Sequence, residues 1–506
     1  MIRFIWKNYS YCTIEGSSTE LMNLWSQYSF YVPGYKFMPS FISGYFDGQI
    51  HLINLKEKTV PLGIINKIDE YCKEESIEVE YINFENYESP SFDDKKYDDF
   101  IKKYKFYSKK NEIIPREDQK ESIIRALTME RCTNVCPTSF GKSLCIFIES
   151  LYYKENNKKV LLIVPTVDLV RQFEEDIRDY CTSPSGLLEE YFPNIQQIYA
   201  GHIKEIDDKT DIVISTWQSI YNMSEEWIQQ FGAILLDECH KASAQCIKGI
   251  FDKAGSVRYR TGWTGTLKSS SINGLQVEGI FGPSKQIIET YELMDKGIVA
   301  QLQINVVRLG YPDDIRKSLK DKTYQDEMKF IEHSSRRTDM ISKLIGSFNK
   351  TGLILCTKIN HLKEYYKKVQ SLYPSKNIYL IYGSNVLYND VKYKTFEELK
   401  PIIENESDAI LICSYGVFST GISIKNLHWI CFGSPTKSFI RTVQSIGRGL
   451  RVSSSKTKVT LIDIVDDLSI KRKRSIKSNY CMKHFEERFK IYMEQKFNYN
   501  IININL

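Results

Sequence analysis

The sequence predicts an α/β protein with two parallel-sheet lobes in tandem, preceded by a small α+β domain and followed by a short helical tail. Three observations predict this fold. The chain has 506 residues, more than one hydrophobic core normally holds. Short runs rich in Val, Ile and Leu recur between stretches of helical periodicity. These runs are continuous rather than alternating, which is typical of strands covered on both faces and therefore of parallel sheets.

Residues 1–100 are expected to form the small α+β domain. Short alternating runs are mixed there with turns such as Gly34–Phe37 and Gly44–Gly48. Polar, charge-mixed sequence from Ser89 to Lys110 interrupts the apolar periodicity and predicts a linker or an exposed helix.

The two lobes are placed at residues 101–295 and 296–470 by their apolar runs. The predicted strands of the first lobe are 159–164, 211–215 and 233–236, and those of the second are 353–356, 378–382, 409–413, 429–432 and 459–463. Residues 471–506 form the tail, which opens with the basic cluster Lys471–Arg474. Met482, Phe485, Phe489, Tyr492 and Met493 then recur at helical spacing, predicting an amphipathic helix packed on a neighbour.

The composition excludes several classes of protein. No apolar run approaches the ~18 residues of a membrane span, so we expect no membrane partner. The first ten residues lack a secretory pattern, so the 12 cysteines are expected to be reduced thiols. The sequence contains no Cys-x-x-Cys pair, so we do not expect a zinc site. A net charge of +5 permits a nucleic-acid partner without arguing for one.

The segment Cys136–Ser143 predicts a phosphate-binding loop. It places a lysine and a hydroxyl on a Gly-terminated turn before a predicted helix, whose amides and positive end attract anions. We expect Lys142 to reach the β- and γ-phosphates and Ser143 to bind Mg²⁺. Cys136 stands where the first glycine of this pattern is usual, so the alternative is a turn that merely contains Gly-Lys-Ser. The loop comprises Pro137, Thr138, Ser139, Phe140, Gly141, Lys142 and Ser143.

Two adjacent carboxylates follow the predicted strand 233–236, at the sheet edge where parallel sheets bind ligands. Asp237 is expected to hold Mg²⁺, and Glu238 to orient and deprotonate an attacking water. The alternative is a solvated helix start. With the phosphate loop, these residues predict ATP hydrolysis.

Two further groups point to the same reaction. The amide of Gln119 can both donate and accept hydrogen bonds, which suits an adenine edge. Arg448 and Arg451 lie three residues apart on a predicted helix, so both guanidinium groups share one face and suit transition-state phosphate charge. If they complete a site whose lysine is in the other lobe, hydrolysis requires the lobes to close. An exposed basic helix face is the alternative.

The order of these motifs resembles helicase superfamily 2 of the DExH type. The elements that carry the resemblance are Arg116 with Gln119, Pro137–Ser143, Pro165-Thr166 with Gln172, Ser215–Gln218, Asp237–His240, Thr264–Thr266, Leu355–Lys358, Thr420–Ser423 and Gln444–Arg451. The resemblance implies RecA-like lobes, ATP and Mg²⁺ as cofactors, and a catalytic set of Lys142, Asp237, Glu238, Gln444, Arg448 and Arg451. It also implies adenine contacts by Arg116 and Gln119, coupling by His240, Thr264, Thr266 and Gly421, and DNA contacts by Thr166, Thr216, Thr357 and Thr420.

Further segments are similar to the members of this superfamily found in T-even phages. They are Gly34–Phe37, Tyr45–Gly48, Lys322–Glu327, Cys413–Ser423 and Glu494–Tyr499. This similarity implies a phage enzyme in the cytoplasm of the infected bacterium, not in the virion. It implies action on branched or partly single-stranded DNA and RNA–DNA hybrids, namely R-loops, forks and Holliday junctions, with strand annealing, in recombination, repair and replication. Residues 1–100 would engage the substrate, and a single-strand-binding protein is an expected partner.

Two alternatives stay open at this stage. An RNA helicase or RNA–protein remodelling ATPase shares these motifs. A non-hydrolysing, ATP-dependent DNA clamp is the alternative from another class, and it is disfavoured because the lysine, both carboxylates and both arginines are present.

Overall fold

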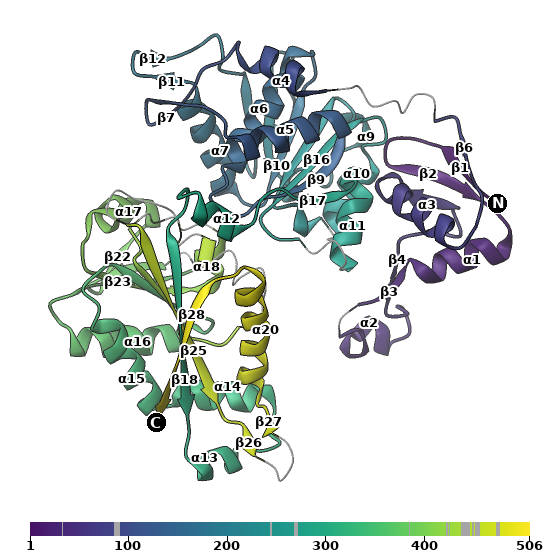
Figure 1. Cartoon of the computed structure of the whole chain (residues 1–506). Coiled ribbons are helices and arrows are strands. Elements are labelled where there is room, and N and C mark those ends of the chain that lie inside the picture. Colours follow the sequence, from purple (N-terminus) through teal and green to yellow (C-terminus); the bar gives the residue numbers. More distant parts are fainter. Residues whose placement is uncertain are drawn as a thin grey trace. The chain divides into compact units, whose positions relative to one another are not determined.

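The computed structural model describes residues 1–32, 34–84, 92–242, 245–267, 272–383, 385–420, 424, 426–436, 446–447, 450, 456–471 and 476–506. The chain forms two compact units. The first contains residues 1–136 and 140–288, and the second contains residues 137–139 and 289–506. Figure 1 shows the elements of both units coloured along the sequence.

The first 82 residues form a small α+β layer structure within the first unit. Its sheet has the strand order β5-β2-β1-β6, in which only the β1–β6 pair is parallel. Helices α1 and α3 bury Leu24, Ile68 and Cys72 against it. The elements are β1 (Ile2–Trp6), β2 (Tyr11–Glu15), α1 (Ser18–Gln27), β5 (Thr59–Pro61), η2 (Leu62–Ile64), α3 (Ile65–Glu74) and β6 (Val79–Ile82).

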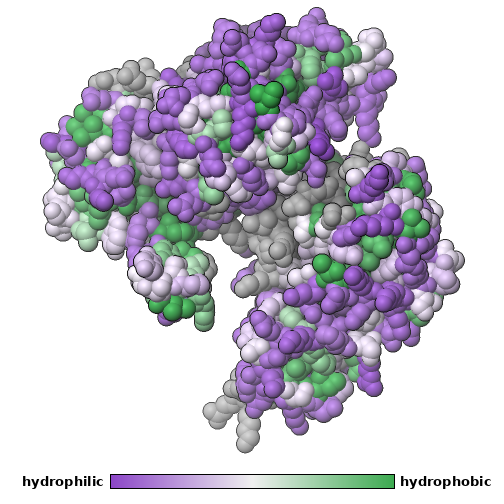
Figure 2. Space-filling model, turned by 180° about the vertical axis from the view of Figure 1, so that it is seen from behind, coloured by the Kyte–Doolittle hydropathy of each residue, from purple (hydrophilic) through white to green (hydrophobic). Residues whose placement is uncertain are grey.

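An extension of this part, which we call the aromatic knob, comprises residues 32–46 as far as they are described. It lies between the antiparallel strands β3 (Ser29–Tyr31) and β4 (Gln49–His51) and contains η1 (Tyr35–Phe37) and α2 (Pro39–Ile42). Large apolar side chains are exposed on it, with Phe37 at 85%, Ile42 at 72% and Tyr45 at 92% exposure. The knob shows apolar patches on its surface in Figure 2.

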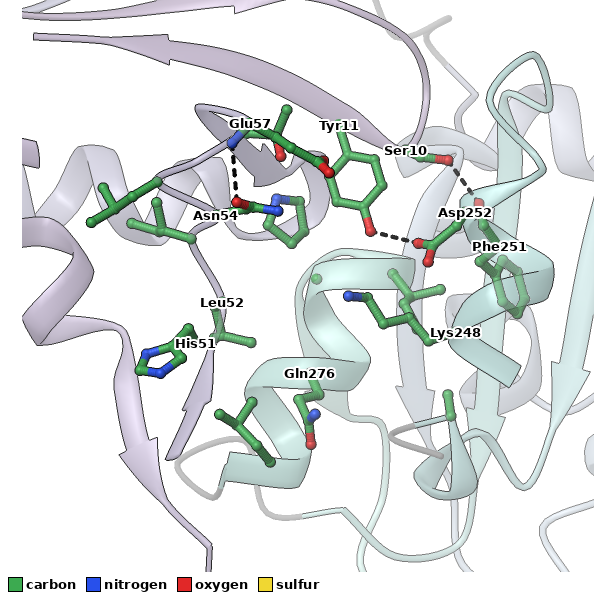
Figure 3. A pocket seen from close by; sticks show the side chains of 18 of the residues that line it. Ser10, Tyr11, His51, Leu52, Asn54, Glu57, Lys248, Phe251, Asp252 and Gln276 are labelled. Carbon is green, nitrogen blue, oxygen red and sulfur yellow. Dashed lines mark hydrogen bonds between the residues drawn. The ribbon is translucent and has the colours of Figure 1, made fainter. Parts of the chain in front are cut away.

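The amino-terminal part is attached tightly to the rest of the first unit. Tyr11 donates a hydrogen bond to Asp252 at 2.5 Å, and Ser10 donates one to the carbonyl of Phe251 at 2.8 Å, beside a cavity of about 780 Å³ (Figure 3). Gly63 lies so close to helix α11 (Ile272–Phe281) that a Cβ would meet the carbonyl oxygen of Glu278 at 2.0 Å. Close backbone approach therefore requires glycine at this position.

The larger sheet of the first unit is wholly parallel, as the continuous apolar runs predict. Its strand order is β13-β14-β10-β15-β16-β9-β17. The strands are β9 (Arg131–Val135), β10 (Val160–Val164), β13 (Ile195–Ile198), β14 (Ile212–Thr216), β15 (Ala233–Asp237), β16 (Tyr259–Thr264) and β17 (Ser284–Gln286). The helices are α4 (Asp94–Ile101), α5 (Glu117–Met129), α6 (Lys142–Glu155), α7 (Val167–Tyr180), α8 (Trp217–Ile220), α9 (Glu225–Ile228), η4 (Cys239–Lys241), α10 (Gln245–Asp252) and α11 (Ile272–Phe281). Two short hairpins, β7 (Phe106–Ser108) with β8 (Asn111–Ile113) and β11 (Thr182–Ser183) with β12 (Gly186–Leu187), accompany them.

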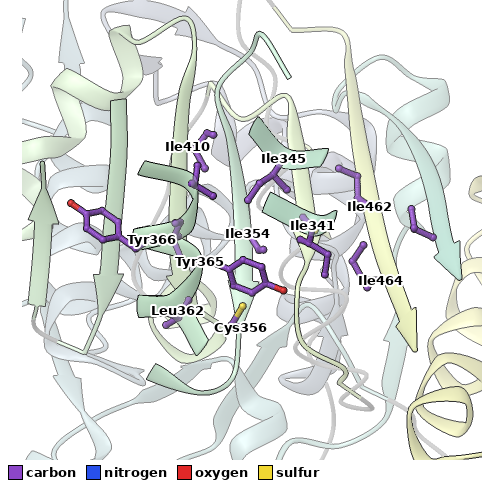
Figure 4. Packing of buried hydrophobic residues seen from close by; sticks show 14 of the residues in the cluster. Ile341, Ile345, Ile354, Cys356, Leu362, Tyr365, Tyr366, Ile410, Ile462 and Ile464 are labelled. Atoms are coloured by element: carbon purple, nitrogen blue, oxygen red, sulfur yellow. The ribbon is translucent and has the colours of Figure 1, made fainter. Parts of the chain in front are cut away.

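The second unit contains a sheet of order β22-β21-β20-β23-β19-β24-β25-β18-β28, antiparallel only at β20–β21 and β21–β22. The strands are β18 (Gln301–Gly310), β19 (Gly352–Cys356), β20 (Asn377–Tyr382), β21 (Asn385–Tyr388), β22 (Val391–Tyr393), β23 (Ala409–Ser414), β24 (Trp429–Phe432), β25 (Lys458–Asp467) and β28 (Asn498–Asn505). The other elements are α12 (Thr290–Asp295), α13 (Asp313–Ser318), α14 (Tyr324–His333), α15 (Ser335–Gly346), α16 (Ile359–Leu372), α17 (Phe396–Asn405), α18 (Tyr415–Thr420), β26 (Ile470–Lys471), β27 (Ile476–Lys477) and α20 (Tyr480–Glu494). Figure 4 shows Ile341, Leu362 and Tyr365 packing on Ile354 and Ile462 of the sheet.

Strand β25 carries two buried ion pairs. Arg337 donates to both oxygens of Asp466 at 2.8 and 3.1 Å, and Arg488 donates to both oxygens of Asp463 at 3.0 and 2.7 Å. All four side chains are at most 1% exposed. The second pair fixes the tail helix α20 to the sheet.

The tail differs from its prediction in two respects. Helix α20 is present, but Met493 is 55% exposed. The buried face of the helix instead includes Arg488 and Tyr492, because both side chains donate hydrogen bonds to Asp463. Residues 498–505 form the parallel edge strand β28, paired with β18, which the apolar spacing did not indicate. Arg472, Lys473 and Arg474 of the predicted basic cluster lie outside the described residues.

Helix α6 contains a buried carboxyl that makes stability depend on pH. Burial raises the pKa of Glu149 from 4.5 to about 7, although Thr261, Trp263 and Tyr153 donate hydrogen bonds to it. Between these values the folded protein holds a proton that the unfolded chain has released, so the stability contributed by Glu149 falls as the pH rises.

We expect Glu149→Gln to remove this dependence. The free energy of unfolding of the variant relative to the wild type should rise from pH 5 to pH 8 by up to about 3 kcal/mol. Chemical denaturation across this pH range measures it, with Glu175→Gln at an exposed site as the control. A constant difference would contradict the assignment.

Candidate functional site

The predicted phosphate loop connects β9 to α6 and ends in a glycine with left-handed backbone. Gly141 has φ +92°, and a Cβ there would lie 2.5 Å from the amide nitrogen of Gln119, so glycine is required. The Nζ of Lys142 donates to the carbonyl of Cys136 at 3.3 Å, folding the lysine over its own loop. This loop follows a strand end and precedes the amino terminus of a helix, as predicted.

Arg116 and Gln119 both hold the loop at Phe140. Arg116 donates to the carbonyl of Phe140 at 2.7 Å, and Gln119 donates to the same oxygen at 2.9 Å. The amide oxygen of Gln119 accepts from the backbone of Arg116 at 3.0 Å. Asp118 binds the Arg116 guanidinium, at 3.1 Å from Nε. The structure therefore brings the predicted adenine-contact residues to the phosphate loop.

The two carboxylates lie where β15 ends. Asp237 is the last residue of the strand, and Glu238 follows with φ 53°, the left-handed region. Burial and the neighbouring charge of Glu238 raise the pKa of Asp237. Burial alone would raise the pKa of Glu238, but His240, whose Nδ1 lies 3.2 Å from a carboxylate oxygen, and the charge of Lys142 lower it. Lys142 thus acts electrostatically on both carboxylates.

These residues fit a bound magnesium nucleotide. Oδ1 of Asp237 is buried and, among the described residues, has no hydrogen-bond partner. A buried carboxylate oxygen without a partner is costly unless a cation or water reaches it. Hard oxygen donors such as this one and the Ser143 hydroxyl are the ligands that Mg²⁺ prefers.

Three of the four predicted coupling residues form one cluster. Nδ1 of His240 lies 2.9 Å from Oγ1 of Thr264 and 3.2 Å from a carboxylate oxygen of Glu238. Oγ1 of Thr264 in turn donates to the carbonyl of Thr266 at 3.3 Å. The cluster therefore joins a catalytic candidate to the segment that follows β16.

Two contacts of the site were missed from the sequence. Asn273 donates from its amide to the carbonyl of His240 at 3.0 Å, and Tyr180 shares a hydrogen bond of 2.7 Å with Ser143. Neither residue belongs to a motif, and both are brought in by helix packing, so no local signal marks them.

The predicted DNA-contact threonines follow neighbouring strands within each unit. Thr166 follows β10 as the N-cap of α7, and Thr216 ends the adjacent strand β14, paired in register with Val164. In the second unit Thr357 is exposed after β19, and Thr420 ends α18 after the adjacent strand β23. Gly421, Gln444, Arg448 and Arg451 lie outside the described residues.

Two family models match the chain. Residues 1–82 match the model described as DNA helicase UvsW, N-terminal, and residues 112–269 match the type III restriction enzyme, res subunit. The ATP-dependent DNA helicase uvsW of Enterobacteria phage T4 is 32% identical over 100% of both chains. The chain belongs to the UvsW family of DNA helicases.

Solved structures agree with this membership of the UvsW family. The crystal structure of T4 UvsW matches with a TM-score of 0.51 and 30% identity, covering 100% of this chain and 99% of its own. S. cerevisiae Dbp5 bound to RNA and ADP BeF3 matches with a TM-score of 0.51 and 13% identity, covering 77% of this chain and 90% of its own, which supports the tandem RecA-like fold alone. Putative helicase 22 of a Sulfolobus islandicus filamentous virus is 26% identical over 67% of this chain and 61% of its own.

Membership of the UvsW family makes the protein an enzyme, an ATP-dependent helicase that binds nucleic acid. The predicted superfamily and fold class are confirmed. No helix in the described part of the chain has both the length and the apolar character that crossing a bilayer requires.

Proposed function

We propose that this helicase remodels branched DNA, unwinding R-loops, regressing forks and migrating Holliday junctions, with strand annealing as a further activity. The observation that carries the proposal is the exposed aromatic knob, which belongs to an amino-terminal part that is hydrogen-bonded to the ATP-binding unit. The full-length similarity to a phage DNA helicase supports DNA as the substrate.

Within the ATP site we propose a role for each candidate residue of the first unit. Lys142 binds the β- and γ-phosphates, Ser143 and Asp237 hold Mg²⁺, and Glu238 accepts the proton of the attacking water. The magnesium ion, when bound, neutralises developing phosphate charge. Arg116 and Gln119 hold the loop and contact adenine beside it.

The surroundings of Glu238 keep its carboxylate in the ionised form that a base needs. Its pKa is lowered, and Nδ1 of His240 lies 3.2 Å from one carboxylate oxygen. We assign Gln444, Arg448 and Arg451 of the second unit to the stabilisation of transition-state phosphate charge. Guanidinium groups in this role change rates by ~10³ to 10⁵ in related reactions.

We assign DNA contact to Thr166, Thr216, Thr357 and Thr420, and coupling to His240, Thr264, Thr266 and Gly421. Thr166, Thr216 and Thr357 lie at the carboxyl ends of parallel strands, and Thr420 ends the short helix that follows another such strand. Hydroxyls at this edge of a sheet suit the sugar–phosphate backbone. Such contacts carry no base information, so DNA structure rather than sequence would be recognised.

The aromatic knob supplies a means of engaging a branch point. Exposed rings are stacking platforms for unpaired bases, and base–aromatic stacking contributes ~1–3 kcal/mol per base. Lys36 lies beside the ring of Tyr35, with 5.8 Å between Nζ and the ring centroid, which adds a cation to the same surface. A branch presents both the unpaired bases and the phosphates that these groups suit.

We expect the double variant Phe37→Ala/Tyr45→Ala to bind forked DNA at least about 30-fold more weakly, because two stacking platforms of ~1–3 kcal/mol each are lost. ATP hydrolysis stimulated by single-stranded DNA should change by less than about 2-fold, since the rings lie outside the ATP site. Fluorescence anisotropy with a labelled fork measures the affinity. Ile203→Ala removes an equally apolar side chain, 77% exposed, and serves as the control; equal losses in both variants would contradict the role of the knob.

The remaining assignments follow from this function. We propose four domains, at residues 1–100, 101–295, 296–470 and 471–506. The protein would act in the cytoplasm of the infected bacterium, together with a phage single-strand-binding protein. These rest on family membership and on the order of the elements.

A panel of substrates tests the proposed function. Purified protein with ATP and Mg²⁺ is given a model fork, a four-way junction, an RNA–DNA hybrid and duplex RNA, and strand release is followed on gels. Conversion of the branched DNA supports the proposal. Selective unwinding of duplex RNA would favour the RNA-remodelling alternative instead.

A further inference from the structure

The hydroxyl of Ser143 is engaged by a residue outside every motif. Its Oγ lies 2.7 Å from the hydroxyl oxygen of Tyr180. Tyr180 is the last residue of α7, which packs against α6, the helix that carries Ser143. The phenol ring stacks on Phe147 of α6, with ring centroids 6.0 Å apart and planes inclined by 20°. Packing therefore fixes the ring and directs its hydroxyl to Ser143.

We propose that Tyr180 is the positioning residue that orients Ser143 towards Mg²⁺. The inference rests on the proposed role of Ser143 as a magnesium ligand. A serine hydroxyl has one proton and two lone pairs. When a lone pair faces the cation, the proton needs an acceptor on another side, and the Tyr180 oxygen stands at hydrogen-bonding distance. Such outer-shell partners fix ligand orientation and change metal affinity by roughly 10- to 100-fold when removed.

The same helix has the proposed DNA contact at its other end. Thr166 is the N-cap of α7, with its hydroxyl accepting from the backbone of Leu169 at 3.4 Å. The 14 residues of α7 span about 20 Å at the rise of an α-helix. One rigid element thus connects Thr166 to Tyr180. If DNA held at Thr166 displaces α7, the preference for the magnesium nucleotide would change with it, and linkage of this kind is reciprocal.

The Tyr180→Phe variant tests the role of the hydroxyl alone, because phenylalanine keeps the ring stacked on Phe147. The dissociation constant of a fluorescent, non-hydrolysable ATP analogue is measured with Mg²⁺ and with EDTA, with and without single-stranded DNA. We expect the magnesium-dependent gain in affinity to fall by roughly 10- to 100-fold in the variant, while the affinity in EDTA stays unchanged. The change that single-stranded DNA causes in this magnesium-dependent gain should also be smaller in the variant than in the wild type.

Two further variants separate the outcomes. Tyr152→Phe, which removes the hydroxyl of a tyrosine in α6, should keep the wild-type magnesium preference, and a matching thermal midpoint for Tyr180→Phe excludes misfolding. If Ser143→Ala loses the preference but Tyr180→Phe keeps it, the role of Tyr180 is wrong and the metal site stands. If Ser143→Ala also keeps it, the metal assignment itself fails. Tighter magnesium-dependent binding by Tyr180→Phe would show that Tyr180 withholds Ser143, which also overturns the proposal.

Discussion

Glu238→Gln is expected to lower the kcat of DNA-stimulated ATP hydrolysis by roughly 10²- to 10⁴-fold, the usual range for loss of a general base. Glutamine keeps the size of the side chain but cannot accept a proton from water. Nucleotide affinity should be retained or increased, because the variant removes a negative charge beside Asp237, whose pKa that charge raises. Phosphate release and analogue binding measured on the same preparation check both parts.

Lys142→Ala distinguishes binding from chemistry in this experiment. That variant should lose nucleotide affinity, whereas Glu238→Gln should lose turnover alone. Glu226→Gln, at the exposed start of α9, is the control and should behave as wild type. Turnover by Glu238→Gln within about 3-fold of wild type would contradict the assignment of the base.

Arg337→Met is expected to destabilise the second unit by about 3–5 kcal/mol, the cost of breaking a buried ion pair on one side. The guanidinium donates twice to Asp466, once to Tyr365 at 2.9 Å and once to the carbonyl of Gly433 at 2.9 Å. Without it, the Asp466 carboxylate stays fully buried and keeps the hydrogen bond that the Tyr311 hydroxyl donates to it at 2.8 Å, but no longer has its ion-pair partner. Urea unfolding followed for the second unit measures the loss.

Arg308 offers a matched control on the neighbouring strand. It pairs with Asp467, the residue after Asp466, but its side chain is 43% exposed. Arg308→Met should therefore cost less than about 1 kcal/mol, as exposed ion pairs usually do. Removing both buried charges with Arg337→Met/Asp466→Leu should recover much of the loss. Equal costs for the Arg308 and Arg337 variants would contradict this account of the core.

The parallel sheets were predictable because their strands are buried on both faces. Runs such as Val160–Val164 and Ala233–Asp237 are apolar or buried throughout, and that pattern identifies a strand without knowledge of its partners. Strand β28 could not be found in this way. Its sequence, Asn-Tyr-Asn-Ile-Ile-Asn-Ile-Asn, lies at a sheet edge, where its partner β18 is almost 200 positions earlier in the chain.

The candidate site likewise contains residues that the local sequence marks and residues that only tertiary packing brings in. Lys142, Asp237 and Glu238 were predictable because each directly follows a recognisable strand or turn. Tyr180 and Asn273 reach the site through the packing of α7 and α11, so their roles depend on contacts over 37 and 33 positions of sequence. The buried arginine at position 488 was missed because helical periodicity treats a charged residue as exposed.

Gel analysis of a labelled model fork tests the central claim most directly. The wild-type protein, with ATP and Mg²⁺, should convert the fork or a four-way junction into its remodelled products, and Glu238→Gln should bind the same DNA without converting it. If the wild-type protein converts neither branched substrate while unwinding duplex RNA vigorously, the assignment of branched DNA as the substrate is wrong.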